Sequence, residues 1–393
     1  MDWTDYLQPL NEEVIVQNGY GNFNTLANRI VSYTEEQGFP DLEGIDLVII
    51  GVCDGRGSIG NEGCGLAADE IRRKLYRLAS PNDRMKMADL GNIVTGDELE
   101  DTHYAITNVA YKLLESHKTV IVLGGGQDTT FAIYKAYEIL GKIVNICAID
   151  SRFDLMDSRD QVNSSSYLNN IIMQDPNYLF NFTNIGYQTY FVGNEFIKLM
   201  DDLKFDAYRV GAIQGDMLRA EPLMRNADVV TVDIGAVRQS DAPANAYPSP
   251  HGFYGEQLCQ LSRFAGMSDK TSCIGFHEMN PEFDSHSQTA HLIAHAVWFF
   301  IEGFYNRLYD FPYRDTQNYK RFMVELKNPD LQLVFHKSKK SDRWWVEVPC
   351  ADDDRRNRYN RHLLIPCEYR DYEQAMQNEI PDLWWKYYTR LND

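Results

Sequence analysis

Three short motifs place carboxylates directly after apolar runs that are typical of β-strands. They are Gly124–Asp128 (GGGQD), Asp150–Asp154 (DSRFD) and Thr231–Gly235 (TVDIG). In a parallel sheet the carboxyl ends of the strands meet at one edge, and ligands of α/β proteins bind there. The side chains of Asp150, Asp154 and Asp233 are therefore expected to converge. Such a group can bind a divalent cation, or a positive side chain of the protein can neutralise it.

The elements that must position these motifs follow an alternating pattern. Short apolar runs rich in β-branched residues predict strands over 46–52, 119–123, 143–149, 207–210, 229–232 and 273–276. Longer stretches with helical spacing occur at 66–80, 103–117, 129–140 and 285–305. Strands that are apolar on both faces and alternate with helices predict a mostly parallel sheet, covered by helices on both sides.

The composition disfavours several classes of protein. The 393 residues are 44% hydrophobic, and 57 acidic residues outnumber 38 basic ones, for a net charge of −19. This balance disfavours nucleic acid as a partner, because such binding rests on cationic contacts to phosphate. The sequence shows no signal-peptide pattern and no apolar run long enough for membrane insertion. The seven scattered cysteines form no CxxC motif and suit a reducing compartment, so a cytoplasmic protein is expected.

The chain beyond residue 310 differs in charge and in aromatic content. Residues 311–393 hold 15 Lys and Arg against 14 Asp and Glu, whereas the preceding part is strongly acidic. Four of the six tryptophans lie there, namely Trp344, Trp345, Trp384 and Trp385. Burying tryptophan needs a packed surface, so strands at 331–335 and 344–348 and a helix at 369–378 are expected to form a small α+β appendage. Adjacent strand residues face opposite sides, so these tryptophans are candidate contacts for a protein partner or a second subunit.

The three motifs, in this order, resemble those of the arginase/agmatinase/formimidoylglutamase superfamily, the ureohydrolases. In that superfamily, motifs of the GGDH, DAHxD and SxDxDxxDP types at successive strand ends bind two Mn²⁺ ions. Other matching segments are Gly51–Arg72, Pro248–Gly252 and Glu278–Pro281. The resemblance is closest to the formimidoylglutamase branch and covers residues 45–310. It implies a three-layer arginase-like domain with a mainly parallel sheet of about eight strands, between an N-terminal extension (1–44) and the appendage (311–393).

The matching positions depart from the ligand set of that superfamily. Its first His, the His of DAHxD and the second Asp of the third motif are replaced by Gln127, Arg152 and Gly235. Arginine cannot ligate a metal ion, and its guanidinium can neutralise the remaining carboxylates through bidentate hydrogen bonds. The sequence therefore predicts that the binuclear manganese site is lost and that no cofactor is bound. The leading hypothesis is a pseudoenzyme that serves as a binding or interaction scaffold.

An alternative hypothesis keeps the hydrolytic activity that the resemblance implies. The substrate would be formimidoylglutamate or a related amidino compound, and the enzyme would use a single metal ion or none. One Mn, Mg or Ca ion could bind four oxygen ligands, from Gln127, Asp150, Asp154 and Asp233. The resemblance then implies that Glu278 contacts the amidine-like group of the substrate and that Asn169 lies near the position of a proton-transferring His. A third hypothesis is a structural role in an assembly.

Overall fold

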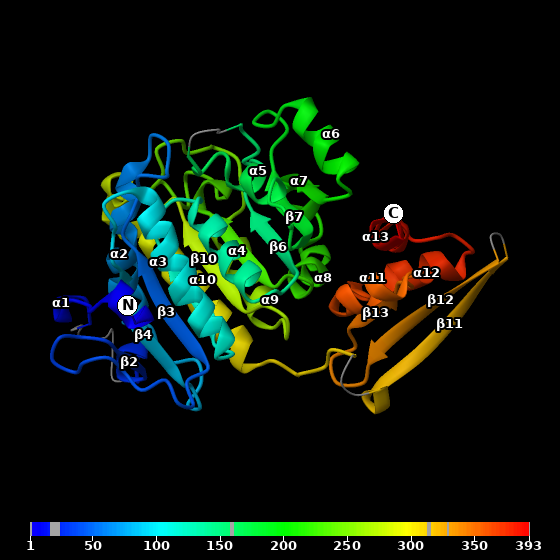
Figure 1. The fold of residues 1–393 in the computed structure, drawn as a ribbon, viewed down its shortest axis with the longest axis horizontal. Coiled ribbons are helices and arrows are strands. Elements are labelled where there is room, and N and C mark those ends of the chain that lie inside the picture. The colour runs from blue at the N-terminus through cyan, green and yellow to red at the C-terminus, as the bar shows by residue number, and fades with distance from the viewer. Residues whose placement is uncertain (1, 16–23, 158–160, 313–315, 328–329, 393) are drawn as a thin grey trace.

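The computed structural model describes residues 2–15, 24–157, 161–312, 316–327 and 330–392. The chain forms two parts, which we call the core (up to residue 310) and the tail (residues 311–392). An extended segment leads from the last helix of the core to the tail, which lies beside one end of the core (Figure 1).

The core is built on one sheet, in which the described residues form ten strands in the order β1-β4-β3-β5-β10-β9-β6-β7-β8, with β2 also paired to β4. Eight parallel strands come from residues 45–310: β3 (Leu47–Val52), β4 (Met87–Ile93), β5 (Thr119–Leu123), β6 (Val144–Ile149), β7 (Leu179–Tyr187), β8 (Asp206–Arg209), β9 (Val229–Asp233) and β10 (Cys273–His277). The predicted parallel sheet is thereby confirmed.

Strands β4 and β7 were not predicted from the sequence, because polar residues interrupt their apolar runs. In β4 these polar side chains are buried and paired, as Asp89 accepts hydrogen bonds from the Arg72 guanidinium at 2.9 Å. The N-terminal residues add β1 (Leu7–Gln8), which is antiparallel to β4, and β2 (Ile30–Ser32), which is parallel to it. Strands of two or three residues are too short to leave a periodic pattern.

Helices cover both faces of this sheet, as predicted. One face packs against α1 (Glu12–Ile15), α2 (Ala67–Leu75), α7 (Val210–Gln214), α8 (Ala220–Arg225), α9 (Gly255–Gly266) and α10 (Gln288–Tyr305). The other packs against α3 (Leu99–Glu115), α4 (Thr129–Ile139), α5 (Tyr167–Ile172) and α6 (Asn194–Asp202). Helix α10 begins three residues later than predicted, because His286 and Ser287 adopt left-handed φ angles of 58° and 55°.

The tail is an ordered α+β unit, which confirms the predicted appendage. Its antiparallel sheet consists of β11 (Tyr319–Lys327), β12 (Asp330–Ser338), β13 (Trp344–Glu347) and β14 (Leu364–Cys367). The helices are α11 (Asp353–Arg358), α12 (Tyr369–Met376) and α13 (Asp382–Asn392). Two of its strands and one helix coincide with the runs that the sequence indicated.

The four tail tryptophans differ in exposure. The rings of Trp344 and Trp345 point to opposite faces of the sheet, but each face is covered. Trp344 stacks on Tyr372 at 5.1 Å between ring centroids, and the guanidinium carbon of Arg225, from the core, lies 4.3 Å from the Trp345 ring. Trp384 is also buried, whereas Trp385 is 53% exposed. Of these four, Trp385 is thus the one available for a partner, and the partner itself stays a prediction.

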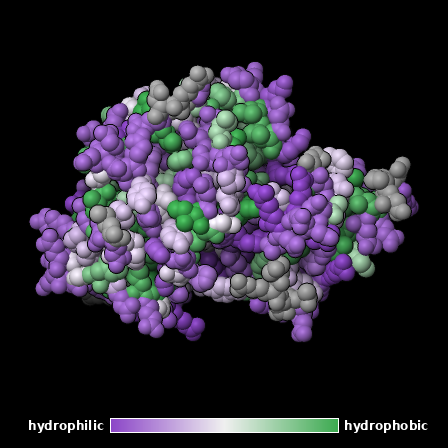
Figure 2. Space-filling view, viewed as in Figure 1, coloured by the Kyte–Doolittle hydropathy of each residue, from purple (hydrophilic) through white to green (hydrophobic). Residues whose placement is uncertain are grey.

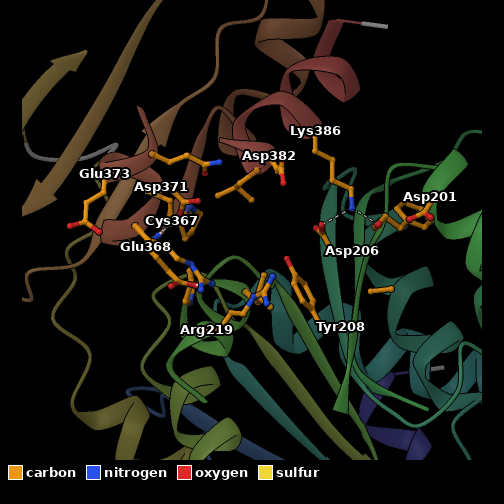
Figure 3. A pocket seen from close by; sticks show the side chains of 18 of the residues that line it. Asp201, Asp206, Tyr208, Arg219, Cys367, Glu368, Asp371, Glu373, Asp382 and Lys386 are labelled. Carbon is orange, nitrogen blue, oxygen red and sulfur yellow. Dashed lines mark hydrogen bonds and ion pairs between the residues drawn. The ribbon is translucent and has the colours of Figure 1, made fainter. Parts of the chain in front are cut away.

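The tail is fastened to the core by polar contacts. The Lys386 ammonium donates to Asp206 at 2.8 Å, an interaction drawn in Figure 3. The Tyr387 hydroxyl accepts hydrogen bonds from the side chains of Asn181 and Asn226 at 3.0 and 2.8 Å. The surface in Figure 2 is mostly hydrophilic, and no helix in the described ranges has the length and apolarity that crossing a membrane requires.

Candidate active site

The carboxylates of the predicted motifs come together at the carboxyl edge of the core sheet. Asp150 directly follows β6, and Asp233 is the last residue of β9, the neighbouring strand. Asp154 follows in the loop after β6, with a left-handed φ of 52°. A cavity of about 260 Å³ opens there, lined by Ile59, Arg152, Asp154, Ser164, Ser165, Asp233, Gly235, Asn245, Tyr247 and Glu278.

These carboxylates are buried and repel one another. Burial raises the pKa of Asp154 well above its usual range, and the neighbouring Asp150 and Asp233 carboxylates raise it further. Burial followed by the charge of Asp150 has the same effect on the pKa of Asp233, and burial raises the pKa of Asp150. Like charges held together away from water are stabilised when a cation lies among them. The cluster therefore has the electrostatics of a cation-binding site.

Arg152 does not supply that cation through direct contact, which corrects the prediction. Its guanidinium carbon lies 4.5 Å from the centroid of the Phe191 ring, and its backbone N–H donates to Asp150 Oδ1 at 2.9 Å. Within the described ranges its side chain forms no ion pair with Asp150, Asp154 or Asp233. The guanidinium contacts the Phe191 ring instead of the carboxylates, and this contact is favourable because cations are attracted to the face of a π-system.

Several oxygen atoms of the cluster are buried without a hydrogen-bond partner in the described part of the chain. They are Gln127 Oε1, Asp150 Oδ2 and Asp154 Oδ2. The Gln127 amide is held in place because its Nε2 donates to Thr231 Oγ1 at 2.9 Å, so its oxygen is left for another partner. Buried polar atoms are rarely left unpaired, and oxygen donors of this kind suit hard divalent cations.

The cluster does not form a finished metal site by itself. Among the described residues, no group of three or more His, Cys, Asp or Glu side chains is arranged to hold a metal ion. Gln127 is not one of these four residue types, but its amide oxygen is also a possible ligand. By their chemistry the unpaired oxygens suit one divalent cation, and binding it would require the carboxylates to move together around it. Gly235 adds no ligand, and its N–H donates to Asp233 Oδ1 at 2.6 Å.

Glu278 lines the same cavity and is fixed by neutral donors rather than by an arginine. It follows β10 with a left-handed φ of 65° and is 6% exposed. Its carboxylate accepts hydrogen bonds from Ser58 Oγ (2.5 Å), Asn61 Nδ2 (2.9 Å) and the backbone N–H of Gln127 (2.8 Å). Burial raises its pKa despite these bonds. The side chain is thus held in place at the wall of the cavity.

Sequence reasoning missed three residues of this site. Ser58 and Asn61 lie in the loop after β3. They belong to the segment Gly51–Arg72, which resembles the superfamily but in which no single residue was predicted to have a role. Tyr167, the first residue of α5, is buried beside the cluster, where burial and the charges of Asp154 and Asp150 raise the pKa of its hydroxyl. Asn169, which was predicted to lie near a proton-transfer position, is not among the described residues that line the cavity.

Comparisons with known proteins identify the family of the chain and relatives with the same fold. The model of the Arginase family matches residues 45–301. A curated formimidoylglutamase of Staphylococcus aureus (strain MSSA476) is 26% identical over 296 residues, covering 72% of this chain and 93% of that protein. Formiminoglutamase of Trypanosoma cruzi, solved with Mn²⁺, superimposes with a TM-score of 0.64 at 18% identity, covering 73% of this chain and 100% of the other. Formimidoylglutamase from Bacillus subtilis gives a TM-score of 0.66 at 16% identity, covering 75% and 96%.

These relatives correct one prediction from the sequence. The absence of a cofactor was inferred from Gln127, Arg152 and Gly235, but a formiminoglutamase of the same fold was solved with Mn²⁺. The identity of a residue at one position does not fix where its side chain points. The Arg152 side chain lies on the Phe191 ring and forms no ion pair with the carboxylates in the described part of the chain.

Proposed function

Because the chain belongs to the arginase family, we propose that it hydrolyses a carbon–nitrogen bond of formimidoylglutamate or a related linear amidine, using one divalent cation. The observation that carries this proposal is the set of buried, unpaired oxygens of Gln127, Asp150 and Asp154 beside Asp233. Buried polar atoms are rarely left without partners, so these oxygens favour a ligand that the folded chain does not itself supply.

The residues of the buried oxygen cluster and those that line the adjoining cavity have distinct roles in this proposal. Gln127, Asp150, Asp154 and Asp233 would hold the cation, which supplies a Lewis acid that activates water near neutral pH. Glu278 can accept hydrogen bonds from the N–H groups of a cationic amidine, because charge-assisted hydrogen bonds of this type are strong and directional. Arg152 lines the same cavity, and its guanidinium can bind a carboxylate of an anionic substrate.

A pseudoenzyme on the same scaffold is the competing hypothesis, since Gln127, Arg152 and Gly235 stand at positions that match metal ligands of the superfamily. The two hypotheses differ in what the purified protein does with metal. We expect the protein, supplied with Mn²⁺, Mg²⁺ or Ca²⁺, to bind one ion per chain and to release formamide from formimidoylglutamate. Agmatine and arginine, assayed for urea, test related amidino substrates.

Two variants test whether the metal ion binds at the carboxylate cluster. Asp233→Asn should lower both the bound metal, measured by elemental analysis, and product release. Asp202→Asn, on the exposed end of α6, is the matched control and should leave both unchanged. A protein that binds one metal ion but hydrolyses none of the three substrates would support the pseudoenzyme instead.

A further inference from the structure

A larger cavity lies at the amino ends of the core strands, whereas the candidate active site lies at their carboxyl ends. Its walls include the first residue of β5 and the residues that directly precede β6, β7 and β10, namely Thr119, Ile143, Tyr178 and Ser272. Residues Arg358, Asn360, Arg361 and His362 of the tail close it from the other side. The cavity has a volume of about 1050 Å³. It therefore exists only where the tail docks on the core.

The lining of this junction cavity is strongly basic, although the chain as a whole carries a net charge of −19. Two acidic residues, Glu115 and Asp269, contribute to it. They are outnumbered by six cationic side chains, those of Lys118, Lys142, Lys270, Arg307, Arg358 and Arg361. A protein this acidic repels anions in general, so a local excess of positive charge is a specific feature of the fold.

Three of these cations share a single carboxylate. Asp228, which is fully buried, lies 2.6 Å from the Arg361 guanidinium, 3.7 Å from Lys270 Nζ and 3.9 Å from Lys142 Nζ. Burial lowers the pKa of Lys270 to about 8; Asp228 opposes this effect, while Arg361 and Lys142 add to it. One negative charge cannot balance three positive ones, so an anion that entered the cavity would relieve their repulsion.

The cavity also has an apolar wall. Leu114, Leu140, Ile143, Pro176 and Tyr178 contribute to its lining. A bare inorganic ion would leave this wall and most of the volume unused, whereas small-molecule sites typically combine apolar walls with a few charged groups. The charge and the wall together favour an organic molecule that carries several negative charges.

The other cavity of the junction, shown in Figure 3, differs in this respect. Its cations already have partners within the protein, as Lys386 pairs with Asp206 at 2.8 Å and Arg370 with Glu368 at 2.5 Å. No excess of positive charge remains there. Of these two cavities, the basic one therefore has the excess positive charge that favours binding of an anion.

We propose that the junction cavity binds a small organic polyanion of the nucleotide type, with its phosphates at Lys142, Lys270, Arg358 and Arg361 and its organic part against Ile143 and Tyr178. Because both core and tail contribute residues, the bound molecule would hold the two parts together. The site is separate from the proposed hydrolytic function and does not depend on it.

The test uses the full-length chain, with ATP, inorganic pyrophosphate and citrate as probes. Isothermal titration calorimetry should show saturable binding of one ATP per chain, tighter than that of pyrophosphate or citrate and weaker at high salt. The thermal unfolding midpoint should rise with ATP concentration. No binding of ATP, or equal binding of ATP and pyrophosphate, would overturn the proposal.

Variants locate the binding. Lys142→Gln and Arg358→Gln should each weaken ATP binding at least several-fold, and both should fold, since neither removes the close Asp228–Arg361 pair. Lys198→Gln, at an exposed position of α6 that is not part of this lining, is the matched control and should bind ATP like the original protein. Equal binding by all three variants would place the ATP elsewhere and refute the proposed site. Asp233→Asn should bind ATP normally, so failure of the hydrolase proposal is recognised separately.

Discussion

The guanidinium of Arg152 stacks on the ring of Phe191, with 4.5 Å between its central carbon and the ring centroid. This contact holds a fixed positive charge at the rim of the carboxylate cluster instead of inside it. Among the described residues the cluster therefore keeps unpaired oxygen atoms, although the sequence places an arginine two residues from Asp150 and from Asp154.

Loosening this stack should weaken metal binding. Phe191→Ala removes a cation–π contact of about 0.5–1 kcal/mol and lets Arg152 turn toward the carboxylates, so Mn²⁺ affinity should fall roughly two- to fivefold. Arg152→Gln removes the positive charge and should raise the affinity. Titration calorimetry with Mn²⁺ measures both, with Phe39→Ala, an aromatic deletion in the N-terminal residues, as the control. Equal affinities in the Phe191 and Arg152 variants would contradict this role of the stack.

Glu278 should matter for turnover more than for metal content. Glu278→Gln removes the charge at the wall of the cavity, and loss of such an electrostatic contact should lower kcat by roughly 100-fold. Ser58→Ala removes one of three donors and should have a smaller effect, because Asn61 and Gln127 still hold the carboxylate. Formamide release and elemental analysis are measured on the same samples. A parallel loss of metal in Glu278→Gln would show that Glu278 acts as a ligand instead.

The two tryptophans of α13 should differ sharply in their effect on stability. Trp384→Ala deletes a side chain that is 1% exposed and should lower the free energy of unfolding by about 3–5 kcal/mol. Trp385→Ala, at 53% exposure, should change it by less than about 0.5 kcal/mol. Urea unfolding followed by circular dichroism provides the measurement. Similar losses in both variants would mean that Trp385 is covered in solution, as expected if a second subunit binds there.

Removing the shared carboxylate of the junction should destabilise the contact between core and tail. Asp228→Asn leaves Arg361, Lys270 and Lys142 facing one another without a counter-charge, and breaking a buried ion pair in this way costs about 3 kcal/mol. Asp216→Asn, a half-exposed residue beside Arg370, should stay within about 0.5 kcal/mol of the original protein. Limited proteolysis beyond residue 310 reports detachment of the tail. Unchanged protection in Asp228→Asn would rule out this account.

His362 should make the stability of the junction depend on pH. Its ring stacks on Phe180 at 4.3 Å between centroids, and burial, followed by the charge of Lys270, holds its pKa well below the ordinary value of 6.5. Between the ordinary value of 6.5 and the lowered pKa of folded His362, the unfolded chain binds a proton that the folded chain does not. The free energy of unfolding therefore falls as the pH drops through this range.

His362→Phe keeps the stacking and removes the titrating group. Its unfolding midpoint should therefore fall less than that of the original protein between about pH 7.5 and about pH 5.5. Thermal unfolding in phosphate-free buffers measures this difference, and His251→Phe, at an exposed position, should keep the original slope. Identical slopes in both variants would exclude His362 as the source.

The sequence alone was sufficient to predict the architecture of the core and the elements that carry its candidate site. Strong apolar runs such as those of β5 and β6 are local signals, and the motif that follows each run fixes which end of the strand carries the carboxylates. The identity of Asp150, Asp154 and Asp233 as one cluster follows from that order. By contrast, β4 was not predicted, because its buried Asp89 is tolerated only through the distant side chain of Arg72.

Only the tertiary structure decided where the charges of the chain are placed relative to one another. The direction of the Arg152 side chain depends on Phe191, and the donors to Glu278 come from the distant loop after β3. The junction cavity joins Asp228 to Arg361, which is 133 residues away in the sequence. Net charge is a sum over the whole chain, whereas electrostatic energy falls with distance, so an acidic sequence gives no sign of a basic cavity that the fold creates.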